Sequence, residues 1–181
     1  MTRMIALLFG LVLMVTMGVS LRINDWDGVM HFHCPVYQSI SRLQSNHSNC
    51  REDRVWDTEC KNTFNKRKSR PICYETNYVN WFDERILFKC PPNWVISGLH
   101  SYHDNKREDR RWRFRCCKQE GVNLHSCKWT GYLNNWDMPL TWSTSSNEFL
   151  AGVNSIHNNL KEDRRWKFLS CEMHKNEATL Q

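Results

Sequence analysis

The strongest constraint on this chain is a six-residue pattern that occurs three times in its 181 residues. Each copy contains Glu-Asp-Arg followed two positions later by Trp, and these tryptophans lie 56 and 54 residues apart. A second set of three tryptophans has 55 residues from the first to the second and 55 from the second to the third. Self-similarity at a fixed period predicts three structural units of about 55 residues. The patterned segments are Arg51–Trp56, Arg107–Trp112 and Lys161–Trp166, and the second set is Trp26, Trp81 and Trp136.

Alternating apolar and polar side chains predict that these units are built from β-strands. In residues 111–116 every second side chain is Trp, Phe or Cys and the others are Arg, which places the two kinds on opposite faces of a strand. Further strands are predicted at 95–101, 149–156, 87–90 and 140–143. One unit cannot bury its apolar face alone, so the copies must share a core. We therefore expect an all-β fold of three ~55-residue repeats around a pseudo-threefold axis, either a β-trefoil or a β-prism-like arrangement.

The N-terminus has the features of a secretory signal peptide at residues 1–20. Arg3 forms a short basic region, an apolar run covers Ile5–Val19, and small residues at positions 18 and 20 fit a cleavage site. A signal anchor is the alternative interpretation. The remaining residues 21–181 are expected to form a single secreted domain, with repeats at about 26–60, 81–117 and 136–171.

All nine cysteines follow the predicted cleavage site, where an oxidising compartment favours disulfides. Their offsets from the repeat tryptophans restrict the pairing, since two cysteines follow a Trp by four residues and two by five. Cys50 has no counterpart, which leaves a disulfide-linked homodimer, a capped thiol or a buried free cysteine. The sequon at Asn46 marks an exposed loop if it is glycosylated. The self-consistent pairs that staple the fold are Cys34–Cys60, Cys90–Cys116, Cys73–Cys117 and Cys127–Cys171.

The triplicated Asp-Arg-x-Trp, followed by an aromatic residue and Cys behind a signal peptide, resembles the dermatopontin family. The resemblance covers roughly Trp26 to Cys171. It implies a secreted, non-enzymatic extracellular-matrix protein that binds dermatan-sulfate proteoglycan, collagen and cell surfaces, or agglutinates cells in some invertebrate members. Copy one lacks the aromatic residue before Cys60, and the chain lacks the Tyr- and Asp-rich N-terminus of vertebrate members. These departures favour an invertebrate-type member.

The triplicated Glu-Asp-Arg is interpreted as structural. Neighbouring carboxylates on a strand point in opposite directions and do not converge on one substrate atom, which argues against acid–base catalysis. The repeat arginines share the parity of the tryptophans, so each is expected to lie on an aromatic face or to pair with a carboxylate near the core. The alternative is one sugar site per copy. The motif residues are Asp53, Arg54, Trp56, Asp109, Arg110, Trp112, Asp163, Arg164 and Trp166.

Basic residues that break the repeat are better candidates for binding. The formal net charge of +6 favours anionic partners. One basic cluster lies between copies one and two, and a second forms a ladder on the polar face of a predicted strand. Forked, charge-assisted bonds from such side chains suit the sulfates of a glycosaminoglycan, and a merely solvated face is the alternative. The candidates are Lys66, Arg67, Lys68 and Arg70 in the cluster, and Arg111, Arg113 and Arg115 in the ladder.

Other functional classes have little support in the sequence. The pairs His31/His33 and His100/His103 have no cysteine or carboxylate at a zinc-binding spacing, so neither a metal nor a cofactor is expected. The order of a catalytic triad and a phosphate-binding loop are both missing, so no enzymatic activity is expected. The secretory signal argues against nucleic acid. Two hypotheses remain: a matrix adhesion protein that binds sulfated glycosaminoglycan or proteoglycan, collagen or cell-surface glycans, and a lectin that agglutinates cells.

Overall fold

The computed structural model describes residues 21–175, which form twelve β-strands. The signal peptide predicted at residues 1–20 lies outside the described residues. The all-β prediction is confirmed, and residues 21–175 contain no helix long and apolar enough to cross a membrane. The strands are β1 (Leu21–Arg22), β2 (Met30–His33), β3 (Gln38–Ser48), β4 (Asp53–Asn62), β5 (Ile72–Glu75), β6 (Ile86–Lys89), β7 (Val95–Asp104), β8 (Asp109–Lys118), β9 (Val122–Trp129), β10 (Leu140–Ser143), β11 (Glu148–Asn158) and β12 (Asp163–Lys175).

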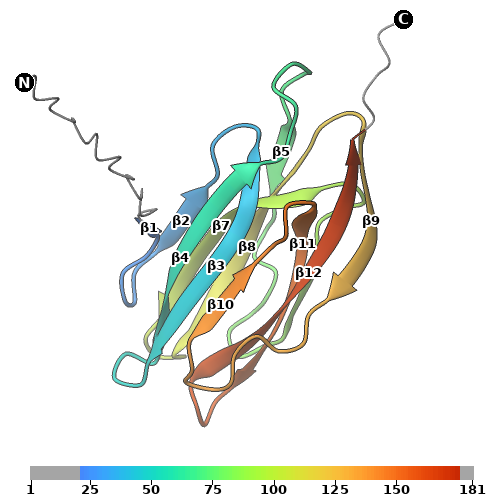
Figure 1. The fold of residues 1–181 in the computed structure, drawn as a ribbon. Helices are drawn as coiled ribbons and strands as arrows, with labels where there is room; N and C mark the ends of the chain where they lie inside the picture. Colours follow the sequence, from blue (N-terminus) through green and yellow to red (C-terminus); the bar gives the residue numbers. More distant parts are fainter. Residues whose placement is uncertain (1–20, 176–181) are drawn as a thin grey trace, which may run out of the picture.

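Three four-stranded sheets with equivalent strand orders make up the fold (Figure 1). Each sheet contains one long antiparallel hairpin, β3–β4, β7–β8 or β11–β12, flanked by two short strands. The short strand that precedes each hairpin pairs with the hairpin of a different copy: β2 with β7, β6 with β11, and β10 with β3. The copies therefore interlock in sheets that no copy completes alone. The assignment to a β-trefoil or a β-prism stays a prediction.

The second and third long hairpins turn in a similar way, because polar side chains at the strand ends stabilise the turns. Asp104 Oδ1 accepts hydrogen bonds from two backbone N–H groups of its own turn, both at 3.0 Å, and Asn158 does the same in the third hairpin. The glutamate that ends each turn has a left-handed backbone, with φ of 45° at Glu52, 44° at Glu108 and 42° at Glu162. Each of these glutamates therefore belongs to a turn rather than to the strand that follows.

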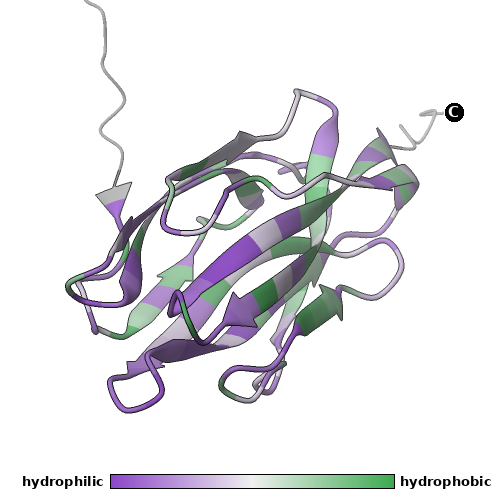
Figure 2. Cartoon of the chain, turned by 90° about the horizontal axis from the view of Figure 1, so that it is seen from below, coloured by the Kyte–Doolittle hydropathy of each residue, from purple (hydrophilic) through white to green (hydrophobic). Residues whose placement is uncertain are grey.

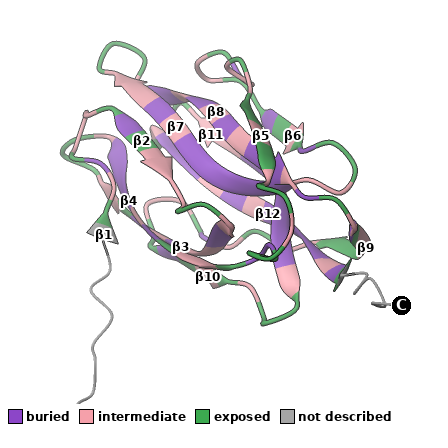
Figure 3. Ribbon diagram, turned by 90° about the horizontal axis from the view of Figure 1, so that it is seen from above, coloured by how far each residue is buried: buried purple, intermediate pink, exposed green. Residues whose placement is uncertain are grey.

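Three tryptophans, one from each hairpin, lie at the centre of the core. Trp56, Trp112 and Trp166 are at most 2% exposed, and their rings meet edge to face with centroids 4.9 to 5.4 Å apart. The long strands carry both hydrophobic and hydrophilic residues (Figure 2) and extended buried stretches (Figure 3), and the alternation is clearest in β8. Side chains from all three hairpins therefore share one core.

Four disulfides connect the strands, and they are the four pairs that the cysteine offsets predict. Two of them join segments of different sheets and two join paired strands of one sheet. Cys50 is exposed in the turn between β3 and β4 and lies outside these pairs, so the interpretation as a buried free cysteine is wrong. An intermolecular role for this thiol stays a prediction. The first two pairs are Cys34–Cys60 and Cys90–Cys116, and the other two are Cys73–Cys117 and Cys127–Cys171.

Candidate functional site

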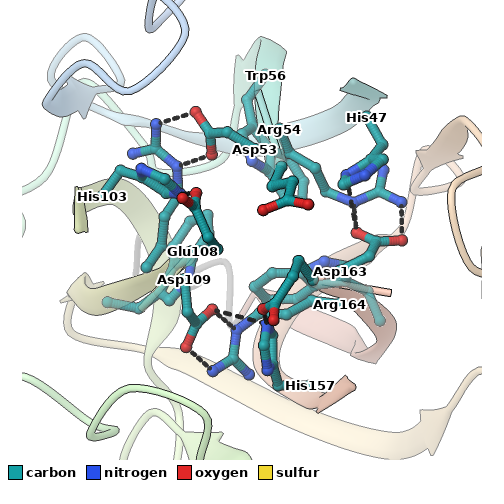
Figure 4. Close-up of a pocket in the computed structure, with 15 residues that line it drawn as sticks. His47, Asp53, Arg54, Trp56, His103, Glu108, Asp109, His157, Asp163 and Arg164 are labelled. Atoms are coloured by element: carbon teal, nitrogen blue, oxygen red, sulfur yellow. Dashed lines mark hydrogen bonds and ion pairs between the residues drawn. The ribbon is translucent and has the colours of Figure 1, made fainter. Parts of the chain in front are cut away.

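A ring of buried ion pairs joins the three hairpins at their turns (Figure 4). The motif arginine of each copy makes a two-pronged pair with the motif aspartate of another copy, with N–O distances of 2.6 to 2.8 Å. All six side chains are at most 5% exposed. The expected pairing of the repeat arginines with carboxylates near the core therefore agrees with the structure. The Arg–Asp ring consists of Arg54–Asp163, Arg110–Asp53 and Arg164–Asp109.

Backbone groups add hydrogen bonds to this ring, although Nη1 of Arg54 and of Arg164 is buried without a hydrogen-bond partner among the described residues. Each ring aspartate accepts one further bond, at 2.8 to 2.9 Å, from a backbone N–H of a loop in its own copy. A buried asparagine of each copy accepts a bond from the N–H of the motif tryptophan and donates to the carbonyl of the motif arginine. Buried charges are tolerated only when they are paired and hydrogen-bonded in this way. The asparagines are Asn24, Asn80 and Asn134.

Three histidines and three glutamates line the cavity inside the ring together with the ring residues. The cavity has a volume of about 20 Å³, room for about one water molecule. The side chains of His47, His103 and His157 are 1% exposed, and His157 Nε2 lies 3.6 Å from Glu162 Oε2. The expectation that neighbouring Glu and Asp point apart is wrong, because the left-handed turn residue does not follow strand alternation.

The electrostatics of the cavity depend on burial and on these close contacts. Burial raises the pKa of Glu108 and Glu162, and the nearby imidazoles of His103 and His157 oppose this shift. Burial also acts to raise the pKa of Asp163, but hydrogen bonds from the His47 and Arg54 side chains outweigh it and hold that pKa well below its ordinary value. The ring carboxylate Asp163 is therefore ionised at neutral pH.

Burial decides between the two interpretations of the triplicated motif. A sugar ring cannot stack on Trp56, Trp112 or Trp166, because these side chains are at most 2% exposed. A cavity of about 20 Å³ is also far too small for a monosaccharide. The proposed sugar site at this motif is therefore wrong, and the motif has a structural role.

The outward side of β8 carries a different arrangement of arginines. The Arg111 guanidinium lies 4.0 Å from the ring centroid of Trp81 and 4.7 Å from that of Tyr78, and the Arg113 guanidinium lies 5.6 Å from Tyr78. Trp81 is 65% exposed. A guanidinium on an aromatic face is held by cation–π attraction and still presents its N–H edge. We call Arg111, Arg113, Tyr78 and Trp81 the Arg111 platform.

Hydrogen bonds orient the two guanidinium groups of this platform. Arg111 Nε donates to the Asn80 carbonyl at 3.0 Å, and Arg113 Nε donates to the Thr76 carbonyl at 2.9 Å. Among the described residues no hydrogen-bond partner is found for the two terminal nitrogens of Arg111. A hollow of about 310 Å³ lies beside them, lined by Asn77, Tyr78, Arg111 and Arg113. Two of the three predicted ladder residues therefore border an open surface hollow.

The other two copies have related platforms. In copy three the Arg165 guanidinium lies 4.1 Å from the Tyr132 ring and Lys167 Nζ lies 4.3 Å from it. In copy one the equivalent strand position is Val55, which is buried. Arg22 of β1 lies 5.4 Å from the Trp26 ring instead. The sequence analysis missed this substitute because it comes from a different strand.

The third ladder residue and the basic cluster lie next to each other. Arg115 donates to His33 Nδ1 at 3.0 Å, and no aromatic contact like those of Arg111 and Arg113 is found for it among the described residues. The cluster lies in the loop between β4 and β5, and its Arg70 lines a hollow of about 40 Å³ together with Arg115. The exposed cluster residues are Lys66, Arg67 and Arg70, and Lys68 is half-buried. The two basic patches predicted from the sequence are therefore neighbours on one side of the molecule.

The glycosylation site has a different setting from the one expected. Asn46 is exposed, but it lies within strand β3 rather than in a loop. Its cross-strand partner is Val55 of β4. An exposed strand position still leaves the side chain accessible, and glycosylation of Asn46 stays a prediction.

Sequence reasoning missed the buried polar residues that support the ring. The asparagines Asn24, Asn80 and Asn134 are 56 and 54 residues apart, the same spacings as the motif tryptophans. His47, His103 and His157 have these spacings as well. The repeat spacing therefore identifies these asparagines and histidines. They were missed because single polar residues are common, and only alignment on the motif tryptophans shows that they recur. His103 belongs to this buried set and does not pair with His100.

The fold and its two arginine arrangements define a disulfide-stapled all-β protein with a structural charged ring and outward cationic platforms. A family model described as Dermatopontin matches residues 24–175. The chain therefore belongs to the dermatopontin family, and the family resemblance is confirmed.

Several curated proteins are similar to this chain. The hemagglutinin/amebocyte aggregation factor of Limulus polyphemus is 45% identical over 153 residues, which cover 83% of this chain and 87% of that protein. The dermatopontin of Biomphalaria glabrata is 36% identical over 141 residues, covering 78% and 93%. Millepora cytotoxin-1 of Millepora dichotoma is 35% identical over 153 residues, covering 84% and 67%. No solved structure matches the chain.

Proposed function

We propose that this chain is a secreted adhesion protein of the extracellular matrix that binds sulfated glycosaminoglycans through the Arg111 platform. The observation that carries the proposal is the pair of oriented arginines beside an exposed tryptophan and an open hollow. Sulfate groups accept forked hydrogen bonds from guanidinium edges, and sugar rings pack on aromatic faces. The family membership agrees with an extracellular adhesion role.

The distribution of charge supports an anionic ligand. Copies two and three carry Arg or Lys at successive outward positions of β8 and β12, and the net charge of the chain is +6. The basic loop residues Lys66, Arg67 and Arg70 extend the cationic surface beyond Arg115. A long sulfated chain can therefore contact several basic groups in succession, which raises its association rate and its affinity at low salt.

Adhesion also requires more than one binding site on a molecule. The Arg22, Arg111 and Arg165 platforms come from three different copies and lie on three different sheets. Three sites on one rigid domain can hold two glycan chains together, because the second contact is made at a high effective concentration. This arrangement supports bridging of matrix or cell-surface glycans by one monomer.

A carbohydrate-binding agglutinin is the second candidate function. The exposed rings of Trp81 and Tyr132 favour it, since aromatic faces bind neutral sugars without any sulfate. A relative named as a hemagglutinin points in the same direction. For this second function we expect that a neutral monosaccharide inhibits the agglutination of cells and that the salt concentration changes the agglutination little.

The test is retention on a heparin column in a salt gradient. Replacing Arg111 and Arg113 by Gln should lower the salt concentration needed for elution, because two oriented charges are lost. The matched control replaces Lys106 and Arg107, two exposed basic residues at the turn of the same hairpin, and should elute like the wild type. A second variant, with Lys66, Arg67 and Lys68 changed to Ser, measures the contribution of the basic loop.

Two results would contradict the glycosaminoglycan proposal. Equal losses in the Arg111/Arg113 variant and in the turn control would show that only total charge matters. Unchanged retention in both the platform and the loop variants would reject these surfaces altogether. Inhibition of agglutination by a neutral monosaccharide would then favour the lectin function.

A further inference from the structure

A group of metal-ligating side chains lies on the outer face of the sheet β2-β7-β8-β5. One ligand atom from each of His31, His33 and Glu75 lies within 4.8 Å of the other two. The ring of His100 is 5.1 Å from that of His31, its cross-strand partner. His31 and Glu75 are exposed and His33 is half-buried, so the group is accessible from solvent.

Sheet pairing brings these residues together from distant parts of the sequence. His31 and His33 are on β2, His100 is on β7, and Glu75 is on β5 at the opposite edge of the sheet. His33 reaches across because its partner on β7 is Gly98, where an added Cβ would lie 2.6 Å from His33 Cδ2. His33 Nε2 thereby comes within 3.0 Å of Glu75 Oε1. No carboxylate lies close to these histidines in the sequence, but the pairing of the strands places Glu75 beside them.

The other two sheets show that the fold does not need these residues. The positions of His31 and His33 correspond by strand register to Leu87 and Lys89 on β6 and to Thr141 and Ser143 on β10. The position of His100 corresponds to Asn154 on β11. Among residues 21–175 these register positions carry histidines on the sheet β2-β7-β8-β5 only, so a structural requirement of the repeat does not explain them.

We propose that His31, His33 and Glu75 form a surface zinc site, with His100 as a fourth ligand. Imidazole nitrogen and carboxylate oxygen are ordinary ligands of Zn²⁺, at about 2.0 to 2.2 Å. Ligand atoms around one tetrahedral ion are then roughly 3.3 Å apart. Ligand atoms within 4.8 Å of one another are close to this spacing, and rotation of the exposed His31 and Glu75 side chains can shorten it.

Zinc binding at His33 breaks contacts that His33 and Glu75 make in the metal-free protein. In the metal-free arrangement Arg115 donates to Nδ1, and Nε2 carries the proton shared with Glu75. Coordination through Nε2 moves the ring proton to Nδ1, so Arg115 has to turn away, and Arg113 loses its contact of 3.4 Å with Glu75 when the carboxylate rotates. The two arginines therefore weaken zinc binding. Removing Arg115 should increase the affinity for zinc rather than decrease it.

The experiment is a calorimetric titration of the chelator-treated protein with ZnCl₂. The wild type should bind one equivalent, and His31→Ala and Glu75→Gln should each weaken binding at least tenfold. Arg115→Gln should tighten it, because that variant removes both the competing hydrogen bond and a positive charge. Melting curves of the variants should overlay that of the wild type, since His31 and Glu75 are exposed.

A matched control is available on another sheet. His125 and His174 form a stacked pair with ring centroids 4.2 Å apart, and His125→Ala removes one imidazole from it. Zinc affinity should be unchanged in this variant. Unchanged affinity in His31→Ala, or equal losses in His31→Ala and His125→Ala, would overturn the site. Weaker binding in Arg115→Gln would overturn the proposed arrangement of ligands.

Discussion

Neighbouring arginines of β8 have opposite roles. Arg110 points inward to the Arg–Asp ring and is 3% exposed, whereas Arg111 points outward onto the exposed ring of Trp81. The ring cavity is lined by six carboxylates and three arginines, although the chain as a whole is basic. Successive side chains of a strand point to opposite faces, so one run of arginines is divided into a structural set and a surface set. The excess positive charge therefore lies on the outside.

The largest effect is expected from breaking the ring. Asp163→Asn leaves Arg54 buried beside a neutral partner, and removing one member of a buried ion pair costs about 3–5 kcal/mol. Urea unfolding measures the loss. Asp25→Asn, at an exposed position, serves as the control and should change stability by less than about 0.5 kcal/mol. A loss below about 1 kcal/mol in Asp163→Asn would show that the ring does not hold the hairpins together.

Acid should weaken the Arg–Asp ring. The pKa of Asp163 is lowered in the folded state, so its stabilising effect is complete above the ordinary value of 3.8 and is lost as the pH falls toward the native value. The free energy of unfolding should therefore fall below about pH 4, with a steeper slope in the wild type than in Asp163→Asn. Equal slopes in the two proteins, measured by urea unfolding at several pH values, would contradict this assignment.

A smaller effect of opposite sign is expected at the cavity glutamates. The pKa of Glu162 is raised by burial, so its ionised form is unfavourable in the folded protein at neutral pH. Glu162→Gln removes that charge and should raise the melting temperature slightly at neutral pH. Below the ordinary value of 4.5 the advantage should disappear, because the wild-type carboxyl group is then protonated. A lower melting temperature at neutral pH would mean that the contact with His157 stabilises the fold.

Much of the fold was predictable from the sequence, because the repeat indicates that the three copies share one core. The alternation at residues 111–116 identified the inward Trp112 and the outward arginines, and the tryptophan offsets identified all four disulfides. The interlocking of β2, β6 and β10 with other copies was not predictable, since local patterns do not specify the partner of a short strand.

The candidate sites were predictable only in part. The arginine ladder was identified by charge, but the role of Arg115 depends on His33, which sheet pairing brings to it from a distant segment. The aromatic partners of Arg111 lie in a loop whose path no periodicity reveals. The glutamates of the motif were placed wrongly because a left-handed turn interrupts strand alternation. Contacts between segments and irregular backbone therefore account for what the sequence did not show.

The variants Arg110→Gln and Arg111→Gln separate a stabilising role of the inward arginines from glycan binding by the outward ones. These variants change the same charge at adjacent positions of one strand, and each is measured by urea unfolding and by elution from heparin. We expect Arg110→Gln to lose about 3–5 kcal/mol of stability while its folded fraction elutes like the wild type. Arg111→Gln should keep its stability and elute at lower salt. Equal losses of stability in the two variants, or wild-type elution of Arg111→Gln, would contradict this division of roles.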